Sequence, residues 1–313
     1  MTGDLSAAPV APTAPAADKS GSGGRVRAFL RLVVIEHSVF ALPFAYLAAL
    51  SAMRTQSGHS VEWLTLALIT VAMVAARTFA MAANRVIDRE VDARNPRTAQ
   101  RELVTGVVST RTAWTGALVA LAVFLASAAA LGWLCLLLAP LAVAPLIAYP
   151  YAKRFTDFPH AVLALAQAVA PVGAWIAVTG RWSWSAVVLG LAVGLWIGGF
   201  DLIYACQDAE VDRVIGVRSV PARFGVRAAL VASSAVHVVT FALFMWFGAL
   251  EGFGGWWYAG LALTAVAFGY EHAIVKSDDL SRVNRAFFTA NGFVGIALFG
   301  FGLADLVSRG LSA

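Results

Sequence analysis

Long apolar stretches, separated by polar segments, follow one another from about residue 32 to residue 307. Each can form a helix of roughly 20 residues, which crosses the hydrocarbon layer of a bilayer and satisfies its own backbone hydrogen bonds there. The pattern therefore predicts an all-α, polytopic membrane protein with nine transmembrane helices. They lie near residues 32–53, 64–84, 112–131, 133–150, 160–179, 184–206, 227–249, 255–275 and 289–307, and the second and sixth extend beyond the hydrocarbon.

The first 24 residues differ from the rest of the chain. They are rich in Ala, Pro, Gly and Ser and hold few large apolar side chains, so they bury too little surface to offset the entropy of ordering. We predict a disordered tail over residues 1–24 and one membrane domain over residues 25–313. The tail lacks the basic and apolar regions of a cleaved signal peptide, so we expect the first apolar stretch to be retained.

Composition narrows the class of protein. Hydrophobic residues make up 60% of the chain and charged residues 13%, against roughly 45–50% and 25% in globular proteins. This excludes a soluble enzyme. Cys135 and Cys206 both lie in apolar stretches, which indicates packing rather than a disulfide or metal framework. The net charge of +5 is explained by orientation in a membrane, so no nucleic acid partner is expected.

The basic residues predict the orientation. Of the 23 Lys and Arg residues, all but four fall on the side of the predicted bundle that carries the N-terminus. The four exceptions are Arg54, Arg181 and Arg309 on the other side and Arg77 inside the second helix. Because cytoplasmic loops retain positive charge, we predict a cytoplasmic N-terminus and an outside C-terminus in the inner or plasma membrane. The long loops after the second and sixth helices then face the cytoplasm.

Polar residues recur along the end of the second predicted helix. Asn84, Asp88 and Asp92 are four residues apart, which places them on one helical face. Arg77 lies seven residues before Asn84, about two turns deeper on the same face. The helix is thus predicted to end in an acidic mouth with an arginine beneath it.

The sixth predicted helix carries a matching pattern. Asp201, Tyr204, Asp208 and Asp212 are separated by three, four and four residues, again on one face. Adding 120 to each residue number of the first motif gives Tyr204, Asp208 and Asp212. The repeat suggests that helices one to four and five to eight are duplicated halves, with the ninth added, and that their cytoplasmic mouths face each other.

Four carboxylates at one membrane surface repel one another unless a cation holds them together. Oxygen ligands favour hard ions such as Mg²⁺, which keeps waters and shares its coordination sphere with substrate phosphates. A single pair of aspartates at a helix end is commonly a solvated face. Two pairs in register, extending back into apolar helices where ionisable groups are costly, favour a metal-bridged diphosphate instead.

These motifs resemble those of the UbiA superfamily of intramembrane prenyltransferases, and the resemblance covers nearly everything after the tail. Two further stretches resemble the branch that prenylates aromatic acids, the 4-hydroxybenzoate polyprenyltransferases and their futalosine-pathway menaquinone relatives: YPYAKR at 149–154 and GVRSVPARFG at 216–225. EHSVFALP at 36–43 and NPRT at 95–98 look more like the menaquinone relatives. The composition, heavy in Arg and Ala, also suits a GC-rich actinobacterium.

The resemblance implies a reaction between a polyprenyl diphosphate and a small aromatic acid in menaquinone or ubiquinone biosynthesis. Mg²⁺ held by Asp88, Asp92, Asp208 and Asp212 assists departure of the diphosphate, and the aromatic ring attacks the resulting allylic cation. Asn84, Asp201 and Tyr204 are the catalytic candidates. Asn84 contributes at the metal, and Asp201, deeper on its face, positions the ring or removes its proton.

The resemblance also implies roles for basic residues. Arg77, Lys153, Arg218 and Arg223 are expected to bind the diphosphate, and Arg154 the carboxylate of the aromatic acid. Paired basic residues at a helix end, such as Lys153 and Arg154, equally suit anchoring to anionic lipid headgroups.

Some residues and functions receive less support. Glu36 and His37 suit an interfacial pair, and neither His237 nor His272 shows a second ligand at a spacing that indicates a transition metal. A membrane transporter is the main alternative, but its coupling residues would lie near mid-membrane, whereas these acids lie at helix ends. Within the superfamily, haem, chlorophyllide or glycerol ether acceptors stay open.

Overall fold

The computed structural model describes residues 41–56 and 59–312, so the predicted tail, Glu36 and His37 lie outside the described residues. Over these ranges the chain is helical, with two isolated β-bridges and no strand, which confirms the all-α prediction. The elements are α2 (Leu42–Thr55), α3 (Trp63–Ile87), α4 (Arg89–Arg94), α5 (Thr110–Leu131), α6 (Trp133–Phe155), α7 (Pro159–Thr179), α8 (Trp184–Ala205), η2 (Cys206–Asp208), α9 (Ala209–Ile215), α10 (Val220–Phe224), α11 (Val226–Leu250), α12 (Gly255–Ile274), α13 (Val283–Arg285), η3 (Ala286–Ala290) and α14 (Asn291–Ser308).

Seven helical stretches within the described residues are long and apolar enough to cross a membrane, so the protein is a multi-pass membrane protein. They comprise α3, α5, α6, α7 and α11, the stretch from α8 through α9, and the stretch from α13 through α14. Two further predicted segments correspond to α2, described over 14 residues, and to α12. α12 has the required length, but Glu271 and His272 lower its mean hydropathy. The count of nine therefore stays a prediction.

Local chemistry sets several helix ends close to where the hydrophobic pattern predicts them. The hydroxyl groups of Ser109, Ser183 and Ser219 cap the first turns of α5, α8 and α10 by accepting backbone N–H bonds. Gly180 ends α7 with φ +67°, a left-handed conformation that glycine adopts without steric cost.

α7 and α8 pack closely because small residues line their contact. A β-carbon added at Gly190 or Gly194 would lie 2.3 Å from the carbonyl oxygen of Ala168 or Ala164, respectively. The helix backbones can therefore approach as small residues allow in membrane proteins. This close packing places the beginning of α7 beside the end of α8 that carries the second aspartate motif, where Asp201 lies.

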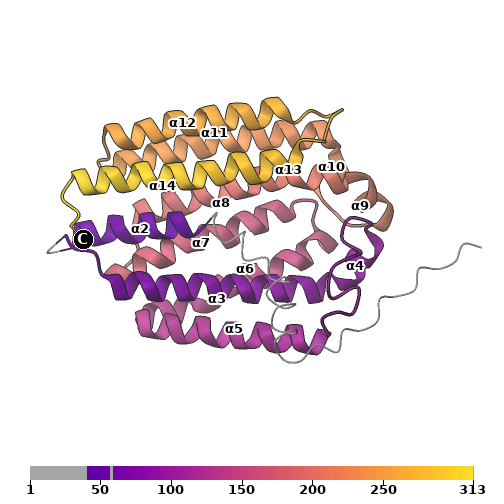
Figure 1. The fold of residues 1–313 in the computed structure, drawn as a ribbon, viewed down its shortest axis with the longest axis horizontal. Coiled ribbons are helices and arrows are strands. Elements are labelled where there is room, and N and C mark those ends of the chain that lie inside the picture. The colour runs from indigo at the N-terminus through magenta and orange to yellow at the C-terminus, as the bar shows by residue number, and fades with distance from the viewer. Residues whose placement is uncertain (1–40, 57–58, 313) are drawn as a thin grey trace, which may run out of the picture.

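The two ends of the bundle differ. Figure 1 shows the short helices α4, α9 and α10 at one end and the C-terminus at the other. There the backbone N–H of Ser312 donates to the carbonyl of His59, so the C-terminal residues lie beside the connection from α2 to α3. The predicted separation of the aspartate-bearing loops from the C-terminus thus holds, and the side of the membrane that each end faces stays a prediction.

Candidate active site

Both aspartate motifs lie where a long helix breaks. We expected one continuous helical face through each motif, but α3 ends at Ile87 and α8 at Ala205. Asp88 (φ −90°, ψ 0°) joins α3 to α4, and Asp208 (φ −100°, ψ −1°) joins η2 to α9. Both occupy the bridge region of backbone conformation, in which many active-site residues are found. The matching breaks support the 120-residue repeat.

The break after α3 is shallow enough to keep the predicted spacing. The N–H of Asp88 donates to the carbonyl of Asn84 at 2.9 Å, and the N–H of Asp92 donates to the carbonyl of Asp88 at 2.8 Å. These bonds retain the four-residue step of an α-helix. The three residues of the first motif therefore still follow one another along one side of the chain.

Basic side chains neutralise the first motif. Asp88 is buried and forms an ion pair with Lys153 from the end of α6. Burial raises the pKa of Asp88, and Lys153 opposes the rise. Asp92, also buried, accepts bonds from Nη1 of Arg101 at 2.6 Å and 2.7 Å. Oδ1 of Asp88 is buried and has no hydrogen-bond partner among the described residues.

The second motif is neutralised unevenly. Asp208 accepts hydrogen bonds from Nε of Arg97 at 2.8 Å and from Nδ2 of Asn95 at 2.9 Å. It also forms an ion pair with Arg97. Nη1 of Arg97 also donates to the hydroxyl of Tyr204 at 3.0 Å. Asp212 is buried and, within the described part of the chain, forms no ion pair; the hydroxyl of Ser219 donates to it at 3.5 Å.

The segment between α4 and α5 links the two motifs. Asn95 and Arg97 contact the second motif, while Arg101 contacts the first. Sequence reasoning missed these three partners. The NPRT stretch at 95–98 carries a family resemblance, but an irregular loop has no periodicity that assigns its side chains to a face.

A cavity of about 420 Å³ extends from the motifs into the bundle. Asn84, Arg85, Asp201 and Tyr204 form part of its polar wall, and apolar side chains, mostly of α3, α5, α6 and α7, line much of the rest. Arg77 also lies in the wall, and its binding of diphosphate stays a prediction. The Nε atoms of Arg77 and Arg85 are buried without a hydrogen-bond partner among the described residues, so the wall presents positive charge to an anion.

Asp201 has a partner that the sequence did not reveal. Nδ1 of His160, on the first turn of α7, lies 2.7 Å from Oδ2 of Asp201. His160 is buried, and its Nε2 has no hydrogen-bond partner in the described residues. The two residues are 41 positions apart, and no motif joins them. Their contact follows from the close packing of α7 on α8.

The remaining predicted basic residues do not all gather at the cavity. Lys153 lies within the acidic cluster. Nη1 of Arg218 donates to the carbonyl of Phe155 at 2.8 Å, and the exposed Arg223 lies 4.0 Å from Asp157.

Arg154 is exposed on the last turn of α6. It donates from Nη2 to the carbonyl of Ile87 at 2.6 Å, and its guanidinium lies over the Tyr151 ring, 5.2 Å from the centroid. Its assignment to an acceptor carboxylate stays a prediction.

The four aspartates fit a hard divalent cation. They supply only carboxylate oxygens, three of the four side chains are buried, and Asp88 Oδ1 lacks a partner. A buried carboxylate oxygen without a hydrogen bond is costly, which a bound cation would relieve.

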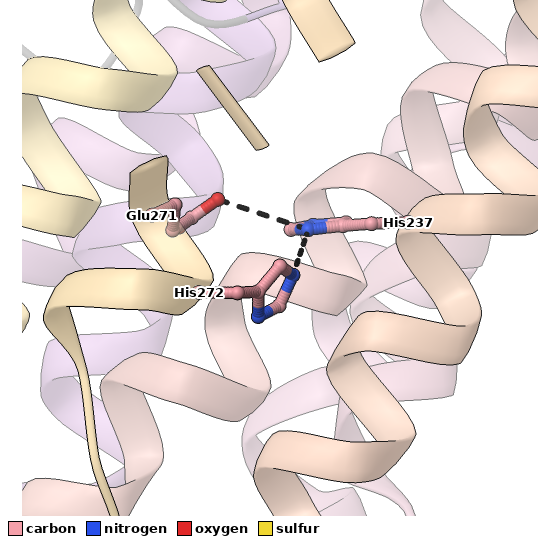
Figure 2. Close-up of side chains that lie close together, drawn as sticks. All are labelled: His237, Glu271 and His272. Carbon is pink, nitrogen blue, oxygen red and sulfur yellow. Dashed lines mark hydrogen bonds and ion pairs between the residues drawn. The ribbon is translucent and has the colours of Figure 1, made fainter. Parts of the chain in front are cut away.

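The interpretation that His237 and His272 lack ligand partners is wrong. Figure 2 shows that α11 and α12 bring His237, Glu271 and His272 together. Glu271 is adjacent to His272 in the sequence, but its approach to His237 depends on the packing of two helices. The spacing of residues along one helix could not show it.

Fold and site together define a multi-pass membrane protein with two aspartate motifs, whose residues Asn84, Asp201 and Tyr204 line the polar end of an apolar cavity. Residues 42–293 match the model of the UbiA prenyltransferase family. A 4-hydroxybenzoate octaprenyltransferase of Nitrosococcus oceani is 34% identical over 241 residues, which cover 74% of this chain and 81% of the relative. The chain therefore belongs to the UbiA family and is a prenyltransferase.

Solved structures agree with this fold. The apo structure of a UbiA homologue from Aeropyrum pernix K1 is 36% identical, with a TM-score of 0.77, and the match covers 87% of this chain and 98% of that one. A UbiA homologue from Archaeoglobus fulgidus bound to DMAPP and Mg²⁺ is 21% identical, with a TM-score of 0.68 and coverage of 90% and 99%. Because the Archaeoglobus fulgidus homologue is only 21% identical, its likeness to this chain shows the fold alone.

Proposed function

We propose that this protein transfers a polyprenyl group from polyprenyl diphosphate to a small aromatic acid in respiratory quinone biosynthesis. The acceptor is of the 4-hydroxybenzoate or 1,4-dihydroxy-6-naphthoate type. The observation that carries the proposal is an apolar cavity whose polar end is lined by Asn84, Asp201 and Tyr204, which belong to the two aspartate motifs. Such a cavity suits a substrate with a charged head and an apolar chain. The names of relatives such as that from Nitrosococcus oceani support the acceptor class.

Asp88, Asp92, Asp208 and Asp212, with Asn84, are the residues that would hold Mg²⁺. When bound, Mg²⁺ neutralises the diphosphate and withdraws electrons from it as a leaving group. Lys153, Arg97 and Arg101 lie among the same carboxylates and supply further positive charge. Arg77 and Arg85 supply it from the cavity wall. Bidentate arginine contacts suit phosphate oxygens.

The reaction breaks the bond between the prenyl C1 and the diphosphate oxygen, and the bonding electrons leave with the diphosphate. The ring carbon of the acceptor then forms a new C–C bond with the allylic cation, and a ring proton departs. Asp201 lines the cavity beside His160 and is assigned to position the ring or accept that proton. The apolar walls exclude water, which would otherwise capture the cation as an alcohol.

The test is an assay of the purified full-length protein with geranylgeranyl diphosphate, Mg²⁺ and either acceptor, with products identified by mass spectrometry. We expect a C-prenylated aromatic acid, and loss of turnover on exhaustive chelation that Mg²⁺ restores. Full activity without divalent metal would contradict the proposed metal role. Turnover only with a haem, chlorophyllide or glycerol ether acceptor would agree with the family assignment but would contradict the proposed aromatic acid acceptor.

For the topology we propose nine helices with the aspartate mouth on the cytoplasmic side, the N-terminus inside and the C-terminus outside. The lopsided distribution of basic residues supports it. In a background without Cys135 and Cys206, a cysteine at the exposed Arg181 should react with an impermeant reagent added to intact cells. One at Val107, which is 58% exposed near the aspartate end, should react only after lysis. The reverse pattern would invert the orientation.

A further inference from the structure

Three polar side chains meet inside the helix bundle, away from the proposed active site. His237 lies on α11, and Glu271 and His272 lie on the last turns of α12. Nδ1 of His237 lies 2.9 Å from Nε2 of His272 and 3.7 Å from Oε2 of Glu271. His237 and Glu271 are 2% and 0% exposed, so water does not reach them freely. Figure 2 shows that all three side chains point toward one another.

This cluster is separated from the cavity by α8. Ile197, Asp201 and Tyr204 of α8 line the cavity, whereas a β-carbon added at Gly199 would lie 2.5 Å from the His237 ring. Gly199 is two residues from both Ile197 and Asp201, which is about 200° around an α-helix. The cluster therefore belongs to the opposite face of α8 and does not depend on the proposed reaction.

Hydrogen bonds fix which nitrogens of the two imidazoles carry protons. Nε2 of His237 lies 3.3 Å from the carbonyl oxygen of Trp196, which can only accept, so Nε2 is the donor. Nδ1 of His272 lies 3.2 Å from the hydroxyl of Ser234, which already donates its proton to the carbonyl of Leu230. The hydroxyl therefore accepts from Nδ1 of His272.

The nitrogens that face each other are consequently both acceptors when the two rings are neutral. Two lone pairs 2.9 Å apart repel, and Oε2 of the buried Glu271 side chain beside them brings a further lone-pair atom. Oε1 of Glu271 accepts from Nδ2 of Asn291 at 2.8 Å, while Oε2 is buried without a hydrogen bond in the described residues. Three lone-pair atoms thus converge, and a cation between them would stabilise the arrangement.

The distances suit a transition metal. Zn²⁺ binds imidazole nitrogen at about 2.0–2.1 Å and carboxylate oxygen at about 2.0–2.2 Å, so neighbouring ligands of a tetrahedral site lie about 3.4 Å apart. The observed separations of 2.9 Å and 3.7 Å lie on either side of this value. All three ligand atoms lie within 4.8 Å of one another. Two imidazoles select such a metal over Mg²⁺.

The outer contacts are those of metal ligands. A histidine bound to metal commonly donates its other N–H to a carbonyl or similar acceptor, which fixes the ring, and bound carboxylates are hydrogen-bonded in turn. Each of the three residues has such a contact on its far atom, to Trp196, Ser234 and Asn291. Phe268 stacks on the His237 ring, with centroids 4.4 Å apart, and covers one side.

We propose that His237, Glu271 and His272 form a binding site for a divalent transition metal of the Zn²⁺ type. The ion would tie α11 to α12 and, through the bonds of Asn291 to Glu271 and to the indole N–H of Trp196, would brace α8 and α14. α8 carries Asp201 and Tyr204 on its other face. The site is therefore structural, and its ion would stabilise the folded protein in proportion to its affinity.

The test measures metal content in the full-length protein purified in detergent. The protein is loaded with Zn²⁺, exchanged into excess Mg²⁺ to occupy the aspartates, and analysed by plasma mass spectrometry. We expect about one zinc ion per chain, lost in Glu271→Gln and in His272→Gln. The controls His59→Gln and Glu62→Gln change exposed residues at the other end of the bundle and should keep the ion.

The proposal would be overturned if the parent protein binds no zinc, or if the zinc content is unchanged in both cluster variants. In that case a proton shared between the two imidazole rings, rather than a metal ion, would hold them together. If the variants aggregate on gel filtration, X-ray absorption at the zinc edge of the parent protein decides the question. Scattering from two imidazoles supports the site. A spectrum that shows only oxygen ligands would place the zinc at the aspartates and overturn the proposal.

Discussion

The two aspartate motifs share a backbone but differ in their electrostatic partners. Asp88 and Asp208 end their helices with nearly identical dihedral angles, 120 residues apart. Yet Asp88 and Asp92 of the first motif form ion pairs with Lys153 and Arg101, whereas of their counterparts Asp208 and Asp212 only Asp208 forms one with a described Lys or Arg residue.

The difference originates in the loops that follow the motifs. The loop after α4 supplies Arg97 to the second motif and Arg101 to the first. After α9, the loop supplies Arg218 and α10 supplies Arg223, and these contact Phe155 and Asp157 instead. The loops that follow the two matching helix breaks are therefore asymmetric, and the loop after α4 neutralises acids in both motifs. This comparison predicts which substitutions act equally in the two halves and which do not.

The largest effect should come from the acids at the two helix breaks. Asp88→Asn and Asp208→Asn should each lower prenyl transfer by at least about 100-fold, because losing a metal ligand costs more than the 10–100-fold typical of residues that only orient one. Equal losses of activity in the two variants would show that the matching helix breaks also contribute equally to catalysis. Initial rates at saturating substrates measure the effect, with Asp279→Asn, on an exposed loop, as control. A rate near that of the parent protein for either variant, with unchanged gel filtration, would contradict the paired-motif proposal.

Removing the link between the halves should have the next largest effect. Arg97→Ala leaves Asp208 without its ion pair and Tyr204 without a donor. Because about a third of the Arg97 side chain is exposed, we expect a loss of only about 1–2 kcal/mol in the free energy of unfolding. Thermal unfolding without divalent metal measures it. Arg218→Ala, which removes a bond to one carbonyl, is the matched control and should cost less. Equal losses would reject the asymmetry of the loops.

Much of the fold follows from the sequence. Predicted segments 112–131 and 184–206 correspond to α5 (Thr110–Leu131) and α8 (Trp184–Ala205), because apolar length and serine caps are local properties. The helix breaks at Asp88 and Asp208 were not predicted. Four-residue spacing is compatible with both a straight helix and a broken one.

The site was predicted where its residues repeat along a helix and missed where helices meet. Asn84, Asp88, Asp208 and Arg77 follow from periodicity. The contacts of His160 with Asp201 and of His237 with Glu271 depend on how α7 packs on α8 and α11 on α12. A single sequence has no signal for such contacts between distant segments. The same reason explains why basic residues of equal charge, such as Lys153 and Arg223, lie in such different places.

Arg154 tests whether an exposed residue at the end of α6 takes part in recognition of the acceptor. If it binds the acceptor carboxylate, Arg154→Ala should raise the Michaelis constant of the aromatic acid about tenfold and leave that of the prenyl diphosphate nearly unchanged. Arg154→Lys should restore it only partly, because an ammonium group lacks the planar fork of arginine. Steady-state kinetics with each substrate varied in turn provide the measurement. An unchanged acceptor constant with reduced stability would limit Arg154 to its contacts with Ile87 and Tyr151.

The smallest effects concern Asp92 and Asp212, the last acids of the two motifs, whose substitution should change the free energy of unfolding in opposite directions. Asp92→Asn weakens the contact with Arg101, so we expect it to lower the free energy of unfolding of the metal-free protein by about 1 kcal/mol. Asp212→Asn removes a buried carboxylate that has no ion pair in the described residues, so it should leave stability unchanged or raise it by about 1 kcal/mol. Thermal unfolding in a chelator measures both variants, and added Mg²⁺ should stabilise each less than the parent protein if both acids are ligands. One informative result is that the two variants change the free energy of unfolding in opposite directions in the chelator and yet lose the same amount of Mg²⁺ stabilisation. That result would show that both motifs contribute equally to Mg²⁺ binding but differ in stability when no metal is bound. Equal destabilisation of both variants in the chelator would show instead that Asp212 has a stabilising partner after all, and the difference between the two motifs would disappear.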